Sequence, residues 1–128
     1  MSQVKDKYRG TVEYHRVFSK LITAAEHRGT VTYQEIAQLM GLPLTGNYMQ
    51  REVGQVLGKI CEDEHDRQRP MLSAVAVQVG GKPGPGFRDL ARQLGRLRDA
   101  SKEAGERFCN EEKGRVYKTW KRPLKTGK

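Results

Sequence analysis

Cysteine is scarce in this sequence. The chain of 128 residues has two cysteines, Cys61 and Cys109, and neither belongs to a CxxC pair or stands near paired histidines. A disulfide framework needs more cysteines, and a Cys/His zinc site needs more ligands. We therefore expect neither of these, and we interpret both thiols as partly buried residues on helices.

Long apolar runs are missing as well. No run reaches the roughly 18 residues that a membrane-spanning helix requires. The first ten residues, MSQVKDKYRG, lack the apolar core of a secretory signal peptide. We expect a cytoplasmic protein that has no membrane partner.

Groups of residues that could catalyse a reaction are equally few. The densest carboxylate segment is EDEHD at 62–66, and a second group is Glu111-Glu112-Lys113. Neither falls on a predicted pair of strands, where a nuclease would need its carboxylates. The glycine-rich loop at 80–86 lacks the Gly-Lys-Ser/Thr ending of a Walker loop. We expect a solvated helix end at 62–66, and we predict no enzyme activity, no metal and no cofactor.

Negative charge is the minority sign. The sequence has 24 Lys and Arg against 15 Asp and Glu, a net charge of +9. Eleven of the basic and five of the acidic residues fall in 96–128, so this segment carries most of the excess. A small domain this basic is typical of proteins that bind a polyanion, because neutralising phosphates releases counterions. From charge alone, a merely soluble basic surface stays open as the alternative.

The remaining pattern predicts one domain that is mainly α with a small β wing, a winged helix-turn-helix. We expect a flexible N-terminal arm at 1–11, the winged helix-turn-helix domain at 12–97, and a C-terminal helix and basic tail at 98–128. The first helix should begin at Val12 and end near Gly29. A length of 128 residues allows a modest core for one such domain but not for two.

The stretch from Thr32 to Ile60 organises this prediction. Thr32 and Glu35 form an S/T-x-x-E capping box that opens a short helix. Gly41 ends that helix and Pro43 prevents its continuation. A second helix should follow with Asn47 as its N-cap, which is the spacing that a helix-turn-helix needs.

The second helix of this stretch has two distinct faces. Its buried stripe comprises Met49, Val53, Val56, Leu57 and Ile60. Arg51, Gln55 and Lys59 recur every fourth residue and form one polar ridge. Gly54 and Gly58 lie beside the ridge, although glycine inside a helix costs about 1 kcal/mol relative to alanine. Close approach of another helix or of a sugar-phosphate backbone would explain them, and the sequence leaves both open.

The last third of the chain predicts a wing and two helices. The run at 71–79 (MLSAVAVQV) is the best candidate strand. The Gly/Pro-rich loop at 80–86 carries Lys82 and would be the wing. Helices are expected at 87–97 and 99–113, with Phe108 on the apolar side of the second, and we expect Val116, Tyr117 and Trp120 to pack back on the domain. Beyond them, Lys118, Lys121 and Arg122 would stay free to contact phosphates without sequence preference.

Five motifs occur in a familiar order: TYQEIA at 32–37, a Gly-Leu-Pro turn at 41–43, REVGQVL at 51–57, Arg-Pro before an apolar run at 69–70, and GPGF at 84–87 before a helix. Together they resemble the DNA-binding domain of O6-alkylguanine-DNA alkyltransferases and alkyltransferase-like proteins.

The resemblance implies a winged helix that meets DNA through the minor groove. Arg51 matches the arginine that takes the place of an extruded nucleotide, and Tyr33 matches the tyrosine that packs against the phosphate of that nucleotide. Glu52, next to Arg51, would place a negative charge near the groove.

One departure bears on chemistry. The alkyltransferases carry Pro-Cys-His-Arg where this chain has Leu-Ser-Ala-Val at 72–75. Ser73 thus replaces the reactive cysteine and no activating histidine follows, so we expect no alkyl transfer.

We therefore predict a non-enzymatic protein that binds double-stranded DNA, either as a general docking module or as a sensor of modified or extruded bases. The alternative is a protein–protein interaction module or an accessory to a nuclease that uses the same winged helix. The expected DNA contacts are Tyr33, Asn47, Arg51, Gln55, Lys59, Ser73, Lys82, Lys118, Lys121 and Arg122.

Overall fold

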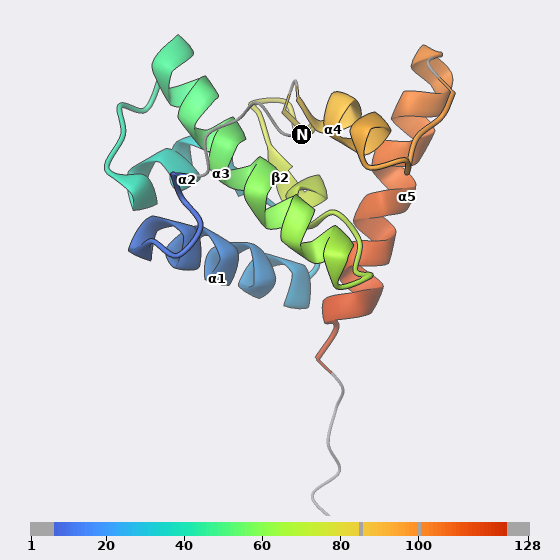
Figure 1. Ribbon diagram of the computed structural model, residues 1–128, viewed down its shortest axis with the longest axis horizontal. Coiled ribbons are helices and arrows are strands. Elements are labelled where there is room, and N and C mark those ends of the chain that lie inside the picture. Colours follow the sequence, from blue (N-terminus) through green and yellow to red (C-terminus); the bar gives the residue numbers. More distant parts are fainter. Residues whose placement is uncertain (1–6, 85, 100, 123–128) are drawn as a thin grey trace, which may run out of the picture.

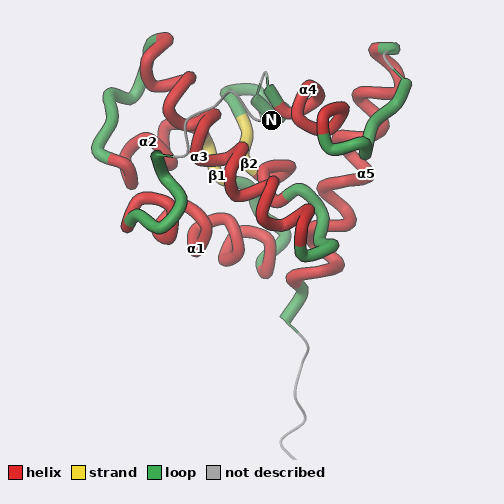
Figure 2. The backbone as a smooth tube through the Cα atoms, in the orientation of Figure 1, coloured by secondary structure: helices red, strands yellow, loops and turns green. Residues whose placement is uncertain are grey.

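The computed structural model describes residues 7–84, 86–99 and 101–122, and these are mainly helical with a small two-stranded sheet (Figures 1 and 2). This confirms the expected mainly α class with a small β component. The elements in order are α1 (Val12–Glu26), β1 (Val31–Thr32), α2 (Tyr33–Met40), α3 (Asn47–Asp66), the 3-10 helix η1 (Leu72–Val75), β2 (Ala76–Val77), α4 (Phe87–Gln93) and α5 (Lys102–Trp120).

The first helix, α1, begins at Val12 as predicted, because the Thr11 side chain accepts a hydrogen bond from the Tyr14 amide and caps it. Its buried face comprises Tyr14, Val17, Leu21 and Ala25. It ends at Glu26, earlier than the expected Gly29. The Gly29 amide donates to the Ala24 carbonyl at 2.8 Å and so closes the helix end.

The capping box of α2 is confirmed. The Thr32 hydroxyl accepts from the Glu35 amide at 3.1 Å, and the Glu35 carboxylate accepts from the Thr32 amide at 2.9 Å. Gly41 ends the helix with a left-handed φ of 73°, a conformation that costs glycine nothing.

The expected N-cap of α3 is wrong by one residue. Gly46, at a φ of 100°, occupies the cap and makes no side-chain hydrogen bond, while Asn47 is already helical and exposed. A side chain is strained at that φ, so the glycine takes the cap position. The predicted inner stripe is confirmed, since Met49, Val53, Val56, Leu57 and Ile60 are all buried.

The predicted strand at 71–79 is mostly wrong. Leu72–Val75 forms a 3-10 helix, and only Ala76–Val77 is extended, pairing in parallel with Val31–Thr32. All seven residues from Met71 to Val77 are buried. A backbone enclosed on every side finds partners other than a strand ladder: the Met71 amide donates to the Glu112 carboxylate at 2.8 Å.

Where a wing was predicted, the described residues form a single tight turn at 78–83, which we call the wing turn after that prediction. The Gln78 amide donates to the Lys82 carbonyl at 2.8 Å, and the Gly81 amide donates to the Gln78 carbonyl at 2.9 Å. One antiparallel bridge, between Val77 and Pro83, closes the turn. Lys82 is exposed on it.

The final helix, α5, packs into the core, as expected for Phe108 and Val116. It runs to Trp120, past the expected end at 113, whereas α4 ends at Gln93, before the expected 97. Phe108 and Val116 are buried in the same cluster as α1 and α3, and the Tyr117 hydroxyl donates to the Gly29 carbonyl at 2.9 Å. Figure 1 shows α5 standing along one side of the molecule.

The described part of the expected N-terminal arm lies against α3. The Tyr8 hydroxyl donates to Glu52 at 2.5 Å, and the Lys7 ammonium lies 2.7 Å from the same carboxylate. Burial acts to raise the pKa of Glu52, but the hydrogen bonds from Lys7 and Tyr8 outweigh it and lower the pKa below its usual value. Glu52 is only 2% exposed, so its charge is satisfied inside the protein by Lys7 and Tyr8.

The segment at 62–66 is not the solvated helix end that we expected. Glu64 is fully buried, and Arg69 donates to both of its carboxylate oxygens at 2.8 Å. The Asp63 carboxylate accepts from the Tyr14 hydroxyl and pairs with Arg9. Within the described residues, no group of three or more potential metal ligands is found.

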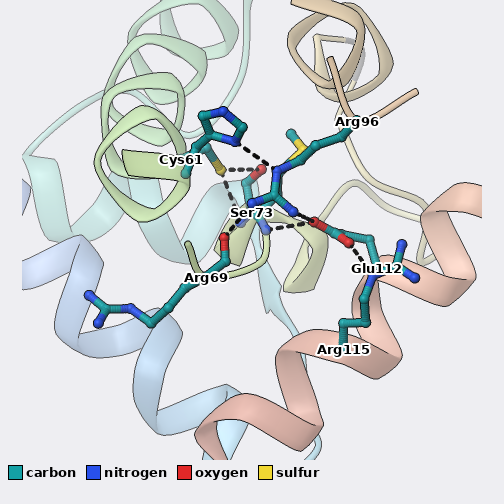
Figure 3. A network of polar contacts seen from close by, with 8 residues as sticks. Cys61, Arg69, Ser73, Arg96, Glu112 and Arg115 are labelled. Carbon is teal, nitrogen blue, oxygen red and sulfur yellow. Dashed lines mark hydrogen bonds and ion pairs between the residues drawn. The ribbon is translucent and has the colours of Figure 1, made fainter. Parts of the chain in front are cut away.

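A second buried carboxylate, Glu112, joins three parts of the chain (Figure 3). It accepts from the Met71 amide, from Arg96 at 3.2 Å and from Arg115 at 2.6 Å. Arg96 also donates to the Arg69 carbonyl at 2.7 Å. Because these donors come from different elements, the Glu112 carboxylate connects α5 to η1 and to the segment after α4. The three donors act as one network that depends on this carboxylate.

Replacing this carboxylate should strongly destabilise the fold. We expect Glu112→Ala to lower the free energy of unfolding by about 3 kcal/mol, because it leaves the buried Met71 amide without an acceptor and removes the ion pair of the half-buried Arg96. Urea unfolding followed by circular dichroism measures the change. Glu111→Ala, on the exposed side of the same helix turn, should change stability by less than about 0.5 kcal/mol; equal effects of the two substitutions would contradict this account.

Candidate nucleic-acid interface

The outward face of α3 contains two glycines, Gly54 and Gly58, beside which there is room for a side chain. Gly54 is exposed and Gly58 is half-buried. A Cβ atom added at either position would meet nothing within 4 Å. Packing against another helix among the described residues therefore does not explain the two glycines. Of the two explanations that the sequence left open, the close approach of an external partner remains.

Arg51 lies one turn before Gly54 on the same face. Its side chain is 60% exposed, and its Nε atom stands 3.6 Å from the Glu52 carboxylate. Because the guanidinium is exposed and the two atoms are 3.6 Å apart, this ion pair contributes little. The guanidinium also lies over the Tyr48 ring, 5.5 Å from its centroid. Arg51 thus remains available to an external partner while the ring limits its orientation.

A cavity of about 370 Å³ opens beside these residues, between α3 and the segment that leads into α4. This volume is within the range of small-ligand pockets. The residues of α3 that line it are Gln50, Arg51, Gly54, Gln55, Leu57, Gly58, Lys59 and Glu62, and the opposite wall includes Ser73, Gly84, Gly86, Phe87, Asp89, Leu90 and Gln93. Tyr33 completes the lining.

The expected polar ridge of α3 changes character along its length. Arg51 is exposed, Gln55 is half-buried and Lys59 is only 5% exposed. The Lys59 ammonium is held in the cavity wall by Glu62 at 3.2 Å, so it is not the exposed contact that we expected. The Oε1 atom of Gln55 is buried without a hydrogen-bond partner in the described structure. A buried orphan acceptor costs about 1–3 kcal/mol, and a donor from a bound molecule would satisfy it.

Tyr33 closes one end of the cavity. It is 5% exposed, and burial raises the pKa of its hydroxyl to about 12, so the phenol stays protonated and can donate. Gly84 allows it to lie there: a Cβ at that position would stand 1.8 Å from the Tyr33 oxygen. The resemblance to alkyltransferases implied a phosphate contact for Tyr33, and the structure places its side chain in the cavity lining.

Ser73, at the position of the alkyltransferase cysteine, is 6% exposed and lines the cavity. The Cys61 thiol donates to its hydroxyl at 3.1 Å. Burial raises the pKa of the Cys61 thiol to about 11, so this thiol is protonated at neutral pH. No activating base hydrogen-bonds to Ser73 in the described structure (Figure 3).

The other predicted contacts lie away from the cavity lining. Asn47 is exposed at the start of α3, and Lys82 is exposed on the wing turn. Lys118 and Lys121 are exposed at the end of α5. Arg122 is not free, because it pairs with Glu26 at 3.1 Å.

Sequence reasoning missed two features of this face. Gln50 and Gln78 exchange amide hydrogen bonds at 2.6 Å and 3.2 Å, which attach the wing turn to α3. Tyr48 is 52% exposed next to Arg51, and Leu44 is 50% exposed in the preceding turn. The i, i+3 spacing of Tyr48 and Arg51 could have indicated their contact, whereas no local signal connects Gln50 with Gln78.

No protein-family model matches this chain, and neither does any of the curated proteins or solved structures with which it was compared. In the parts of the chain that the structure describes, no helix combines the length and apolarity needed to cross a bilayer.

The packing of Tyr33 against Gly84 yields a stability prediction. Gly84→Ala should lower the free energy of unfolding by about 1–3 kcal/mol, because the new methyl group overlaps the tyrosine ring. In a Tyr33→Leu background the same substitution should cost clearly less, and a double-mutant cycle of urea midpoints measures the difference. Additive losses would show that the two residues do not meet as described.

Proposed function

We propose that this protein binds double-stranded DNA without catalysing a reaction, and that α3 is the element that enters a groove. The observation that carries the proposal is the open glycine face beside Arg51. Two helix-interior glycines together cost about 2 kcal/mol relative to alanine, and no contact within the described chain explains them. A sugar-phosphate backbone that lies close against α3 would explain the two glycines.

Arg51 and the cavity support a more specific role. An exposed guanidinium that stands at the mouth of a base-sized pocket can occupy the space of an extruded nucleotide while the nucleotide enters the pocket. The buried orphan acceptor of Gln55 suits the N–H donors of a base edge. We propose that the cavity receives an extruded or modified base, as the resemblance to alkyltransferase-like proteins implies.

The winged helix-turn-helix architecture is part of the same proposal. The short α2, the turn at 41–46 and the long α3 supply the helix-turn-helix, and the tight turn at 78–83 serves as the wing. The contacts of Lys7 and Tyr8 with Glu52 support the placement of α3 in a groove, because they compensate a carboxylate that would otherwise repel DNA.

The alternative is a protein-interaction module, favoured by one observation. Leu44 and Tyr48 are exposed apolar side chains at the same end of α3. A protein partner that covered them would bury Arg51 as well. Binding of a short duplex in the absence of any other protein separates the two proposals.

The first test of the proposed DNA binding concerns Arg51. Binding of a short duplex, measured by fluorescence anisotropy, should weaken with increasing salt as counterions return to the phosphates. Arg51→Ala should lose on the order of 1–3 kcal/mol of binding free energy. Arg16→Ala, an exposed arginine on α1, is the matched control and should bind like the wild type. Absence of binding at low salt, or equal effects of the two substitutions, would sink the proposal.

The second test of the proposed DNA binding separates the effect of a glycine substitution on stability from its effect on DNA affinity. Gly54→Ala should raise the free energy of unfolding by about 0.5–1 kcal/mol, because alanine favours the helix and its methyl group meets open space. The same variant should bind the duplex several-fold more weakly, because the methyl group keeps the backbone away. Thermal unfolding and anisotropy on one preparation measure both. A stabilised variant with unchanged affinity would show that α3 does not contact DNA through this face.

A further inference from the structure

A second cavity, separate from the one beside α3, lies between the wing turn and α5. Its volume is about 130 Å³. The wing turn and α4 contribute Gly81, Lys82, Pro83 and Arg88, η1 contributes Ala74, and α5 contributes Glu106, Cys109, Asn110 and Lys113. The residues that α5 contributes lie beyond the last of the five motifs that resemble alkyltransferases, GPGF at 84–87.

The charges around this cavity are unbalanced. Lys82, Arg88 and Lys113 face a single carboxylate, Glu106. Across the described residues, no ion pair or hydrogen bond engages any of these three cations. Their neighbours differ: Arg92 pairs with Asp89, and both Arg96 and Arg115 pair with Glu112. Three unpaired cations around one hollow repel one another, and a bound anion would relieve that repulsion.

Arg88 is held at the cavity by the shape of α5. It is half-buried, and its guanidinium lies against Gly105. A Cβ atom at Gly105 would stand 2.9 Å from the Arg88 Nε atom. Gly105 is therefore a glycine inside a helix whose missing side chain makes room for an arginine, and the backbone of α5 accepts about 1 kcal/mol for it.

We propose that this second cavity is a binding site for a phosphate-type oxyanion, with Arg88, Lys113 and Lys82 as its cationic ligands. The planar guanidinium of Arg88 supplies paired donors that match two phosphate oxygens, and the lysines add point charges. The Asn110 side chain in the lining can donate a further hydrogen bond. The oxyanion is either a backbone phosphate of nucleic acid or a small phosphate compound.

Cys109 provides a reporter inside the site. It lines the cavity and is half-buried, whereas Cys61 is fully buried and burial raises the pKa of its thiol to about 11. Neutral iodoacetamide should therefore alkylate Cys109 in the native protein before Cys61. Its rate of alkylation, followed by intact mass, reports whether the cavity is occupied.

The experiment measures this rate in inorganic phosphate and in sodium chloride of equal ionic strength. Phosphate should slow alkylation of Cys109 several-fold and saturably, whereas chloride should not. Phosphate should also raise Tm, because a ligand that binds only the native state stabilises it. Equal rates in the two salts together with equal Tm values would overturn the proposal.

A pair of variants that leaves the charge unchanged tests the geometry. Gly105→Ala displaces the Arg88 guanidinium, so phosphate should lose most of its effect on both the rate and Tm. Gly114→Ala, on the same helix with nothing within 4 Å of its added Cβ, should respond to phosphate like the wild type. Lys113→Met should weaken the phosphate effect as well. Loss of the effect in Gly114→Ala, or its survival in Gly105→Ala, contradicts the assignment.

A duplex arm separates the two sources of phosphate. A short duplex that protects Cys109 assigns the site to the nucleic-acid backbone, and it would extend the DNA-binding surface to α5. A duplex that binds by anisotropy without protecting Cys109 assigns the site to a small phosphate compound. A duplex that does not bind at all contradicts the proposed function and leaves the phosphate site standing.

Discussion

The buried carboxylate of Glu112 is the constraint on which much of the architecture depends. It accepts hydrogen bonds from the Met71 amide, from Arg96 and from Arg115, with no exposure to solvent. A charge that is desolvated to this extent is tolerated only when all its partners are in place. The partners come from the start of η1, from the segment after α4 and from α5, so one side chain fixes the positions of these three elements relative to one another.

The position of these elements determines which residues lie beside the outward face of α3. The segment that begins at Met71 carries Ser73 to the cavity and continues into β2 and the wing turn. The reciprocal amide pair of Gln50 and Gln78 then attaches the turn to α3. The acidic residues Glu52, Asp63 and Glu64 of α3 are all engaged by internal partners. Arg51, the two glycines and the cavity are therefore on a face of α3 from which these three carboxylates are withdrawn.

Local signals predicted the helical scaffold well. The Thr32–Glu35 capping box, the glycine stop at Gly41 and the apolar stripe of α3 were each readable, because each depends on residues within one or two turns. The start of α1 at Val12 was readable for the same reason. The fully buried run at 71–77 was not, since β-branched residues favour a strand, whereas its first amide, that of Met71, donates to Glu112, a side chain distant in the sequence.

The candidate site followed the same division. The positions of Arg51, Gly54 and Gly58 on one face came from helical periodicity alone. Periodicity could not show whether those glycines contact another helix, because that depends on where every other element lies. The burial of Lys59 also escaped prediction, because its partner Glu62 stood in a segment that we expected to be solvated. The packing of Phe108 and Val116 on the domain was expected, whereas the extension of α5 to Trp120 was missed, since apolar residues two turns apart give a weak helical signal.

The central claim is that the open glycine face of α3 is where DNA lies. Amide chemical-shift mapping of the labelled protein with a short duplex tests it most directly. We predict that the largest shifts cluster at Arg51, Gly54 and Gly58 and extend to the lining of the adjacent cavity, while His15 and Lys20 on α1 do not move. Shifts confined to the end of α5, with α3 unchanged, would contradict the claim and assign DNA binding to the basic C-terminal segment.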